Sequence, residues 1–217
     1  MKKLAIFDLD GTLLYTLEDL HASTNFALES EGLPARSLDE VRCFVGNGIR
    51  KLIERAVPDG CAPDVTDRVF AAFKRHYAEN CMVLTRPYPG IPEMLDALKA
   101  RGWKLGVVSN KADEPVKALI AHYFPGVFDS VVGERENVRK KPAPDSVFET
   151  VGSLGCDIGQ AVYIGDSDVD GQTAANAGCD CVLVAWGFRG RETLLPFGCP
   201  IADSTDELLN ILTEGEK

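Results

Sequence analysis

The sequence predicts a doubly wound α/β fold with a parallel sheet, into which an all-helical segment is inserted near the N-terminus. Three observations support this prediction: short apolar runs without polar alternation, helical periodicity between most of these runs, and one long stretch where that periodicity continues without a strand. Strands that are covered on both faces lose the alternation of apolar and polar residues. Strands that alternate with helices form parallel sheets.

Five short apolar segments are expected as strands, with helices between them. Glycine stands near the end of several helical patterns, which is a common stop signal. The strands are Leu4–Phe7, Lys104–Val108, Ser130–Val132, Ala161–Ile164 and Cys181–Ala185. The helices run over residues 91–102, Glu114–His122, Ser146–Leu154 and Asp168–Ala177.

Residues 14–84 break this alternation, because four helical patterns follow one another without a strand. Thr16 is the expected N-cap of the first, and Asp19 would complete a capping box with it. The segment starts after the first strand and ends before the second. We therefore expect a core of residues 1–13 and 85–217, and a helical cap domain of residues 14–84 over one end of the sheet. The four patterns are Leu17–Glu31, Leu38–Phe44, Gly48–Val57 and Val65–Asn80.

The composition argues against several classes of function. The 217 residues include 33 acidic and 23 basic ones, which gives a net charge of -10. Nucleic acids and anionic membranes require a basic face, so neither is an expected partner. Seven cysteines without a Cys-x-x-Cys pair indicate reduced thiols rather than disulfides or a zinc site. Without a signal peptide or an apolar run of about 18 residues, a cytoplasmic protein is expected.

Carboxylates follow the first expected strand. Asp8 and Asp10, in the motif DLDGT at residues 8–12, would point to the same side if the chain stays extended. Two unit charges about 4 Å apart repel by roughly 4 kcal/mol at an effective dielectric constant of about 20. That repulsion requires a cation or a shared proton. The alternative is an ordinary strand-end turn, in which Asp and Gly are common.

A second group of carboxylates follows a later strand, in the motif GDSDVD at residues 165–170. Asp166, Asp168 and Asp170 supply hard oxygen ligands of the kind that suits Mg²⁺. The alternative is a helix N-terminus rich in acidic residues, which the helix dipole favours.

Two further loops carry polar groups. Ser109 and Asn110 end the strand in VVSNK at residues 107–111, where a hydroxyl and backbone N–H groups can bind phosphate oxygens. Lys141 lies in KKPAPD at residues 140–145, where two prolines fix it ahead of a helix. Taken separately, each is also consistent with an ordinary strand end or a basic surface loop. Open α/β sheets bind ligands beyond the carboxyl ends of their strands, so we expect all four motifs to converge there.

In their order and in their residues, the four motifs resemble those of the haloacid dehalogenase-like superfamily of phosphohydrolases. The resemblance covers nearly the whole chain. It is closest to the phosphoglycolate phosphatase-type subgroup, in which a helical cap follows the first motif of a Rossmann-like core. Residues 45–53 (VGNGIRKLI) and 102–106 (GWKLG) also read like that subgroup.

The resemblance implies a two-step phosphoryl transfer. Asp8 would be the nucleophile and would form an aspartyl-phosphate. Asp10 would protonate the leaving group and later activate the water that hydrolyses the intermediate. Ser109, together with Asn110 and Thr12, would bind the substrate phosphate.

The resemblance also implies a Mg²⁺ site. Asp8, Asp166 and the backbone carbonyl of Asp10 would hold the ion, and Asp170 would order the water around it. Lys141 would neutralise charge around the nucleophile and the transferring group.

The cap segment matches the subgroup less closely. Tyr15 stands where members usually carry Asp, so the resemblance does not define what this linker does. Asn47 and Arg50 lie in a Gly-rich loop, where they would meet a substrate carboxylate. The alternative for both is the turn that starts a helix.

The sequence therefore favours a Mg²⁺-dependent phosphatase acting on a small phosphorylated metabolite, with phosphoglycolate as the first guess. Inorganic pyrophosphatase and sugar-phosphate mutase are alternatives within the superfamily. A non-catalytic module that binds a phosphometabolite is the alternative from another class, although such modules typically lack the nucleophile or the lysine. The sequence defines neither the physiological substrate, nor the oligomeric state, nor the motion of the cap.

Overall fold

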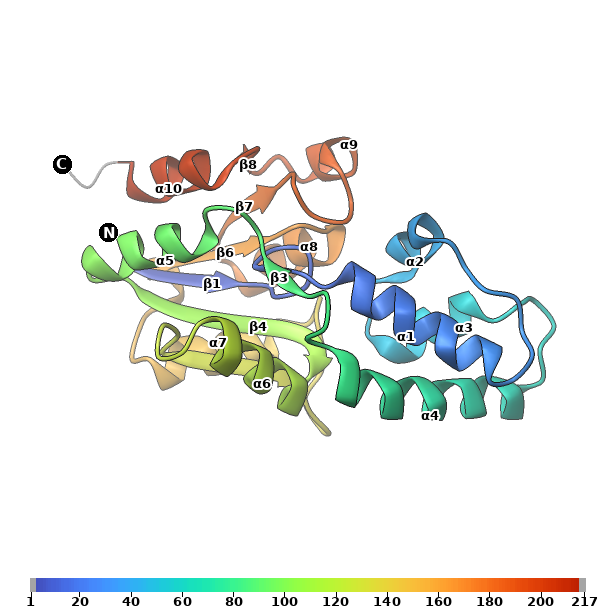
Figure 1. The fold of residues 1–217 in the computed structure, drawn as a ribbon. Coiled ribbons are helices and arrows are strands. Elements are labelled where there is room, and N and C mark those ends of the chain that lie inside the picture. The colour runs from blue at the N-terminus through green and yellow to red at the C-terminus, as the bar shows by residue number, and fades with distance from the viewer. Residues whose placement is uncertain (1–2, 215–217) are drawn as a thin grey trace. The chain divides into compact units, whose positions relative to one another are not determined.

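The computed structural model describes residues 3–214, in two compact units (Figure 1). The first unit contains residues 3–14 and 87–214, and the second contains Tyr15–Arg86. Two short strands, β2 (Leu14–Tyr15) and β3 (Arg86–Pro87), pair where the chain passes from one unit to the other. None of the helices within residues 3–214 has the length and apolar character needed to cross a membrane.

The first unit contains a six-stranded sheet in the order β5-β4-β1-β6-β7-β8, and all neighbouring strands run parallel. The α/β core expected from the sequence is therefore confirmed. The chain adds β4 and β5 on one side of β1 before it returns to add the other strands on the opposite side. Sheets of this kind bind ligands beyond the carboxyl ends of their strands, here the ends of β1, β4 and β6. The strands are β1 (Leu4–Phe7), β4 (Lys104–Ala112), β5 (Ser130–Glu134), β6 (Ala161–Gly165), β7 (Asp180–Val184) and β8 (Ile201–Ala202).

Helices connect these strands, as the alternating pattern predicts. Leu4 and Ile6 of β1 join a buried cluster with Val147 of α7 and Ala174 of α8. The next residue, Phe7, points to the opposite face of the sheet, because successive side chains of a strand alternate. The helices are α5 (Ile91–Ala100), α6 (Asp113–Tyr123), α7 (Asp145–Ser153), α8 (Asp168–Ala177), α9 (Arg191–Leu194) and α10 (Thr205–Thr213), with 3-10 turns at η1 (Ile158–Gln160) and η2 (Leu195–Phe197).

The C-terminal part contains elements that the sequence pattern did not predict. β8 is two residues long and α9 is four, which is too short for hydrophobic periodicity to register. α10 follows Ser204, whose hydroxyl accepts the N–H of Glu207, and it buries Leu208 and Leu212 one helical turn apart.

β4 is longer than predicted because it continues through a bulge. Its regular ladder with β5 stops at Val108 and resumes at Ala112, so residues 109–111 face a single residue of β5, Gly133. An insertion of this kind bends a strand and disrupts the ladder locally. A Cβ added at Gly133 would lie 2.5 Å from the Cα of Asp113. Gly133 therefore leaves the space that the bulge needs.

The second unit contains the helices of the insert. Thr16 precedes the first helix without a side-chain capping bond, so the capping box expected with Asp19 is wrong. The Asp19 carboxylate instead accepts the N–H groups of Leu84 at 3.0 Å and Thr85 at 2.9 Å, and Asp19 is only 2% exposed. It thereby ties the start of the first helix to the segment that ends the unit. The helices are α1 (Leu17–Glu29), α2 (Leu38–Phe44), α3 (Ile49–Ala56) and α4 (Pro63–Asn80).

Gly133→Ala is expected to destabilise the protein, because the new methyl group would collide with the backbone beside the bulge. Overpacking of this kind costs about 1–3 kcal/mol. Gly152→Ala is the matched control, since Gly152 lies in α7 with nothing within 4 Å of an added Cβ. Alanine there should raise stability by about 0.5–1 kcal/mol. Thermal unfolding compares the two variants, and equal melting temperatures would contradict this account of Gly133.

Asp19→Ala is expected to lower stability by about 1–3 kcal/mol, because two backbone N–H groups lose their buried acceptor. Asp39→Ala is the control: that carboxylate is 83% exposed and pairs with Arg42 on the surface, so its loss should change stability little. The measurement is the midpoint of thermal unfolding. If the Asp19 variant loses no more than the control, water replaces the carboxylate and the interaction is not structural.

Candidate active site

Asp8 directly follows β1 and is held at the edge of the sheet by its backbone. Its N–H donates to the carbonyl of Ile164 in β6 at 2.8 Å, which continues the ladder past the end of β1. Its Oδ1 accepts the N–H of Leu9 at 2.7 Å. Asp8 is 8% exposed, so its carboxylate lies in a site with little access to water.

Asp8, Asp166 and Asp170 form a cluster of buried carboxylates. One oxygen of each lies within 4.8 Å of the others. Asp166 follows β6 directly, and Asp170 stands in the first turn of α8, where it forms a capping box with Ser167. The structure thus brings together the first and last motifs singled out in the sequence. Oxygen donors in this arrangement suit a hard divalent cation.

Lys141 lies between two of these carboxylates. Its Nζ is 2.9 Å from Oδ1 of Asp8 and 2.8 Å from Oδ1 of Asp170, and its side chain is 3% exposed. Lys140, by contrast, is exposed and pairs with Glu134 at 3.5 Å. Three carboxylates around one lysine leave an excess of two negative charges when all are ionised. A buried excess of this kind requires a cation or bound protons.

Burial shifts the ionisation of the cluster. Burial raises the pKa of Asp8 to about 7 against the opposing charge of Lys141, and the charge of Asp170 adds to the rise. Burial, together with the charges of Asp170 and Asp8, raises the pKa of Asp166 well above its ordinary value. For Lys141, burial disfavours the charged form, but Asp170 and Asp8 outweigh it and its pKa rises. The cluster therefore keeps protons at a pH where exposed carboxylates have lost theirs.

Asp166 is enclosed by backbone on two sides. Its Oδ2 accepts the N–H of Phe188 at 2.7 Å, and its Oδ1 accepts the hydroxyl of Thr12 at 3.3 Å. Gly11 and Gly187 pass so close that an added Cβ would lie 2.4 Å or 2.2 Å from atoms of Asp166. Within residues 3–214, both groups that donate to Asp166 are neutral. In that part of the chain, Asp166 is therefore held by neutral donors and not by an ion pair.

The bulge of β4 carries the second motif to the same edge of the sheet. The hydroxyl oxygen of Ser109 accepts the N–H of Lys111 at 3.2 Å. The Asn110 amide nitrogen donates to the carbonyl of Lys141 at 3.1 Å. Ser109 and Asn110 are both buried. The structure thus places the expected phosphate-binding residues next to the lysine motif.

Asp10 is not part of the carboxylate cluster, and it pairs with a residue that the sequence analysis did not single out. Lys111 Nζ lies 2.9 Å from one oxygen of Asp10 and 3.0 Å from the other. Lys111 ends the motif VVSNK, where its residue type alone does not distinguish it from a surface lysine. The bulge in β4 brings it to Asp10, and a bulge is a property of the folded ladder.

Tyr163 is a second residue that the sequence analysis treated only as part of a strand. Its hydroxyl lies 3.1 Å from the carbonyl of Val108 and 3.3 Å from Oδ1 of Asp170. The ammonium of Lys141 stands 5.7 Å from the centre of its ring. Tyr163 is fully buried, and a buried phenol needs a hydrogen-bond partner. A tyrosine within an expected buried strand was therefore the only indication in the sequence that polar groups would lie nearby.

Asn47 and Arg50, the residues expected to contact substrate from the cap, lie in the second unit and interact within it. Arg50 pairs with Glu54 at 3.0 Å and with Asp67 at 2.6 Å. The side-chain oxygen of Asn47 accepts a hydrogen bond from Arg55 at 2.8 Å. A role in substrate binding stays a prediction for both residues.

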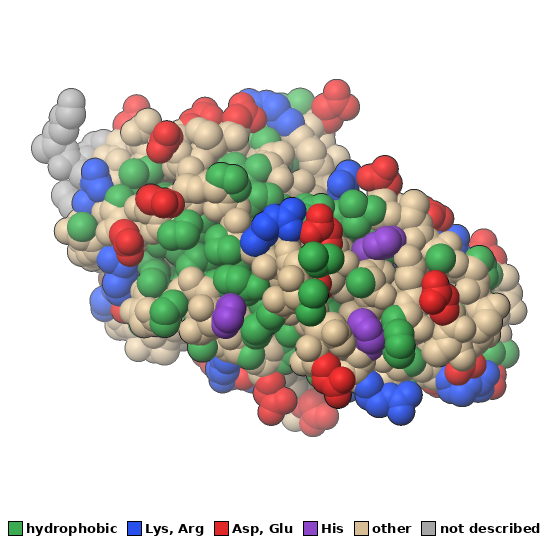
Figure 2. Space-filling model, viewed as in Figure 1, with side chains coloured by type: hydrophobic (Ala, Val, Ile, Leu, Met, Phe, Trp, Pro, Cys, Tyr) green, Lys and Arg blue, Asp and Glu red, His purple; other side chains and the backbone are tan. Residues whose placement is uncertain are grey.

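Charged side chains of both signs are mixed on the face of the molecule drawn in Figure 2. On the face drawn in Figure 2, Lys and Arg side chains stand among Asp and Glu side chains and form no continuous basic patch. Exposed pairs such as Lys99 with Asp129, 2.8 Å apart, are part of this pattern. The buried cluster of Asp8, Asp166 and Asp170 contrasts with these exposed pairs, because it gathers three carboxylates within 4.8 Å of one another.

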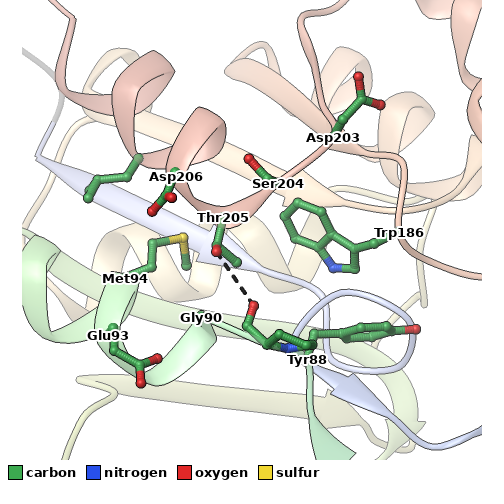
Figure 3. A pocket seen from close by; sticks show the side chains of 11 residues that line it. Tyr88, Gly90, Glu93, Met94, Trp186, Asp203, Ser204, Thr205 and Asp206 are labelled. Atoms are coloured by element: carbon green, nitrogen blue, oxygen red, sulfur yellow. Dashed lines mark hydrogen bonds between the residues drawn. The ribbon is translucent and has the colours of Figure 1, made fainter.

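The first unit also contains a pocket of about 570 Å³, and one of its walls contacts the loop after β1 (Figure 3). The rings of Tyr88 and Trp186 lie 6.4 Å apart in that wall. Trp186 donates from Nε1 to the carbonyl of Thr12 at 3.1 Å, so this wall and the Asp166 contact share one loop. None of the lining residues was predicted to be functional. They are Tyr88, Pro89, Gly90, Glu93, Met94, Trp186, Asp203, Ser204, Thr205, Asp206 and Leu209.

The chain is similar in sequence and in structure to known proteins. A family model described as haloacid dehalogenase-like hydrolase matches residues 5–184. A phosphoglycolate phosphatase of Aquifex aeolicus is 35% identical over 195 residues, which cover 89% of this chain and 90% of that protein. A phosphoglycolate phosphatase of Caulobacter vibrioides is 38% identical over 194 residues, which cover 87% and 82%.

A solved structure from Lactobacillus delbrueckii subsp. bulgaricus, assigned to the phosphoglycolate phosphatases, superimposes with a TM-score of 0.92 and 36% sequence identity. The match covers 98% of this chain and 99% of that one. The similarity thus extends through both units rather than the α/β core alone. The resemblance recognised from the four motifs is confirmed: the chain belongs to the haloacid dehalogenase-like hydrolase family, and it is a phosphoric monoester hydrolase of that family.

Proposed function

We propose that this hydrolase is a Mg²⁺-dependent phosphatase of small phosphate monoesters, with phosphoglycolate as its substrate. The carrying observation is the cluster of three buried carboxylates that contains one lysine. Its excess of two negative charges matches the charge of one divalent cation. The names of the relatives from Aquifex aeolicus and Caulobacter vibrioides support phosphoglycolate as the substrate.

Asp8 is the nucleophile in this proposal. One of its carboxylate oxygens forms a bond to phosphorus while the bond from phosphorus to the leaving oxygen breaks. Asp10 donates a proton to that oxygen, so the alcohol leaves neutral. In the second step Asp10 takes a proton from water, the water oxygen bonds to phosphorus, and the bond to Asp8 breaks. The products are inorganic phosphate, the alcohol and the original enzyme.

Asp8, Asp166 and the backbone carbonyl of Asp10 would hold Mg²⁺. When bound, the ion neutralises the nucleophile and the phosphate, which otherwise repel each other. Lys141 contributes a further positive charge at Asp8. Asp170 fixes that lysine through its Oδ1 at 2.8 Å, and it would also order the water around the ion.

The substrate phosphate would be bound by small polar groups at the same edge. Ser109 and Asn110 are buried in the β4 bulge, and Thr12 lies in the loop after β1. Neutral donors of this kind bind phosphate oxygens without adding a counter-charge. They suit a site where the cation and Lys141 already supply the positive charge.

The helical unit, Tyr15–Arg86, would act as the cap domain that excludes water during the reaction. Asn47 and Arg50 would then contact the carboxylate of phosphoglycolate. Arg50 already pairs with two exposed carboxylates, so its guanidinium would have to exchange one of them for the substrate. We place the protein in the cytoplasm, in keeping with seven cysteines that stand as thiols rather than in disulfides.

Phosphate release tests this proposal. Phosphoglycolate, other small monoesters, pyrophosphate and a hexose phosphate are each supplied with Mg²⁺ or with a chelator. The expected result is hydrolysis of phosphoglycolate that the chelator abolishes and Asp8→Asn reduces by at least about 10³-fold, since the nucleophile is lost. Asp96→Asn, on the exposed face of α5, is the matched control and should keep full activity. Unchanged activity in the Asp8 variant would refute the mechanism.

Metal-free protein is expected to lose stability as pH rises from about 4 to 7. The reason is that the pKa of Asp8 is about 7 in the folded protein and near 3.9 in an unfolded chain. The folded state therefore holds more protons across this window, and raising the pH penalises it. The measurement is the melting temperature as a function of pH, with and without Mg²⁺.

Mg²⁺ should raise the melting temperature more at pH 7.5 than at pH 5, because protons compete with the ion for the same oxygens. Asp8→Asn should flatten part of the pH dependence, whereas Asp96→Asn should leave it unchanged. A metal-free melting temperature that rises between pH 5 and 7 would contradict the expected sign.

A further inference from the structure

We propose that Lys111 is a positioning residue that fixes the carboxylate of Asp10 for its acid–base role, separately from the charge neutralisation at Asp8. The inference rests on the proposed function, in which Asp10 transfers protons. It deepens that proposal by assigning a residue whose role neither the sequence motifs nor the relatives' names indicate.

The geometry of the pair is the first argument. Lys111 Nζ lies 2.9 Å and 3.0 Å from the two oxygens of Asp10, so one ammonium contacts both oxygens of the carboxylate. The Lys111 side chain is 2% exposed, and that of Asp10 is 16% exposed. Asp10 is therefore the more accessible member of the pair, and the ammonium that holds it is buried.

The separation of the two lysines is the second argument. Lys141 contacts Asp8 and Asp170, at 2.9 Å and 2.8 Å. Lys111 contacts Asp10. A buried ammonium is costly unless it is paired, and the two lysines are paired with different carboxylates. Loss of Lys111 should therefore affect Asp10 without removing the partner of the nucleophile.

The backbone on both sides of the pair is the third argument. Asp10 forms a bridge with Leu14, and the N–H of Gly11 donates to the carbonyl of Leu14 at 2.9 Å, which fixes the loop. Lys111 stands in the β4 bulge opposite Gly133. With both backbones fixed, the remaining freedom of Asp10 lies in its own short side chain. The ion pair with Lys111 removes that freedom.

Proton transfer depends on such placement, since a displacement of about 1 Å in a reacting group can cost roughly 10²-fold in rate. Loss of Lys111 should slow the reaction only for substrates whose leaving oxygen needs a proton. An alkyl phosphate needs that proton, whereas a dinitrophenyl phosphate releases a stable anion without it. The leaving group therefore separates positioning of Asp10 from a general effect on charge or folding.

The experiment compares phosphoglycolate, or the best alkyl phosphate of the screen, with 2,4-dinitrophenyl phosphate. For Lys111→Met we expect kcat on the alkyl phosphate to fall roughly 10- to 100-fold. Single-turnover release of dinitrophenolate should fall less than about 3-fold, since that step needs no proton from Asp10. Lys140→Met removes the same charge from an exposed lysine and should leave both rates unchanged.

A double-mutant cycle provides the second readout. Asp10→Asn removes the acid–base group, so adding Lys111→Met to it should cause no further loss on the alkyl phosphate. Lys111→Arg should restore part of the rate, because a guanidinium can also engage both oxygens of a carboxylate. Thermal unfolding checks that each variant folds. If Lys111→Met does not fold, the rates on the two substrates are compared for Lys111→Gln and Lys111→Arg instead.

Equal losses on both substrates, or additive losses in the cycle, would overturn the positioning role while leaving phosphatase activity intact. A wild-type protein that hydrolyses neither substrate would instead overturn the proposed function itself. The two failures are therefore distinguishable.

Discussion

The ion pairs of Lys141 hold the candidate site together, because they join three segments that are far apart in the sequence. Asp8 follows β1, Lys141 precedes α7, and Asp170 opens α8. Removing one partner of such a buried group leaves the remaining charges uncompensated, which lowers the stability of the protein by about 3–5 kcal/mol. The same lysine also fixes the residual charge of the site, and with it the charge that a bound cation has to supply.

The sequence predicts repulsion between Asp8 and Asp10, because two carboxylates at this spacing carry like charges. The structure offsets the repulsion by pairing the two carboxylates with different ammonium groups: Asp8 with Lys141 and Asp10 with Lys111. The division suits a reaction in which one carboxylate attacks and the other moves protons. Each can then be tuned by a different neighbour.

The parallel sheet could be predicted from the sequence, and so could the convergence of the four motifs at one edge of it. Buried parallel strands and strand-end carboxylates have patterns that are visible in the local sequence. The β4 bulge could not be predicted, since Gly133 resembles any other glycine until the strand opposite is known. Asp19 shows the same limit. Its local pattern indicated a capping box with Thr16, but the amides of Leu84 and Thr85, some 65 residues away, bind it instead. Interactions between distant residues decide such cases.

The strand order has a consequence for how the site comes into being. Asp8 and Asp166 meet because β6, late in the chain, pairs with β1, at its start. A folding intermediate that lacks this strand pair has no cluster and offers a divalent ion only scattered carboxylates. An ion that binds the completed cluster therefore favours the finished sheet over every partly built one by mass action. Metal binding would therefore stabilise only the fully assembled core.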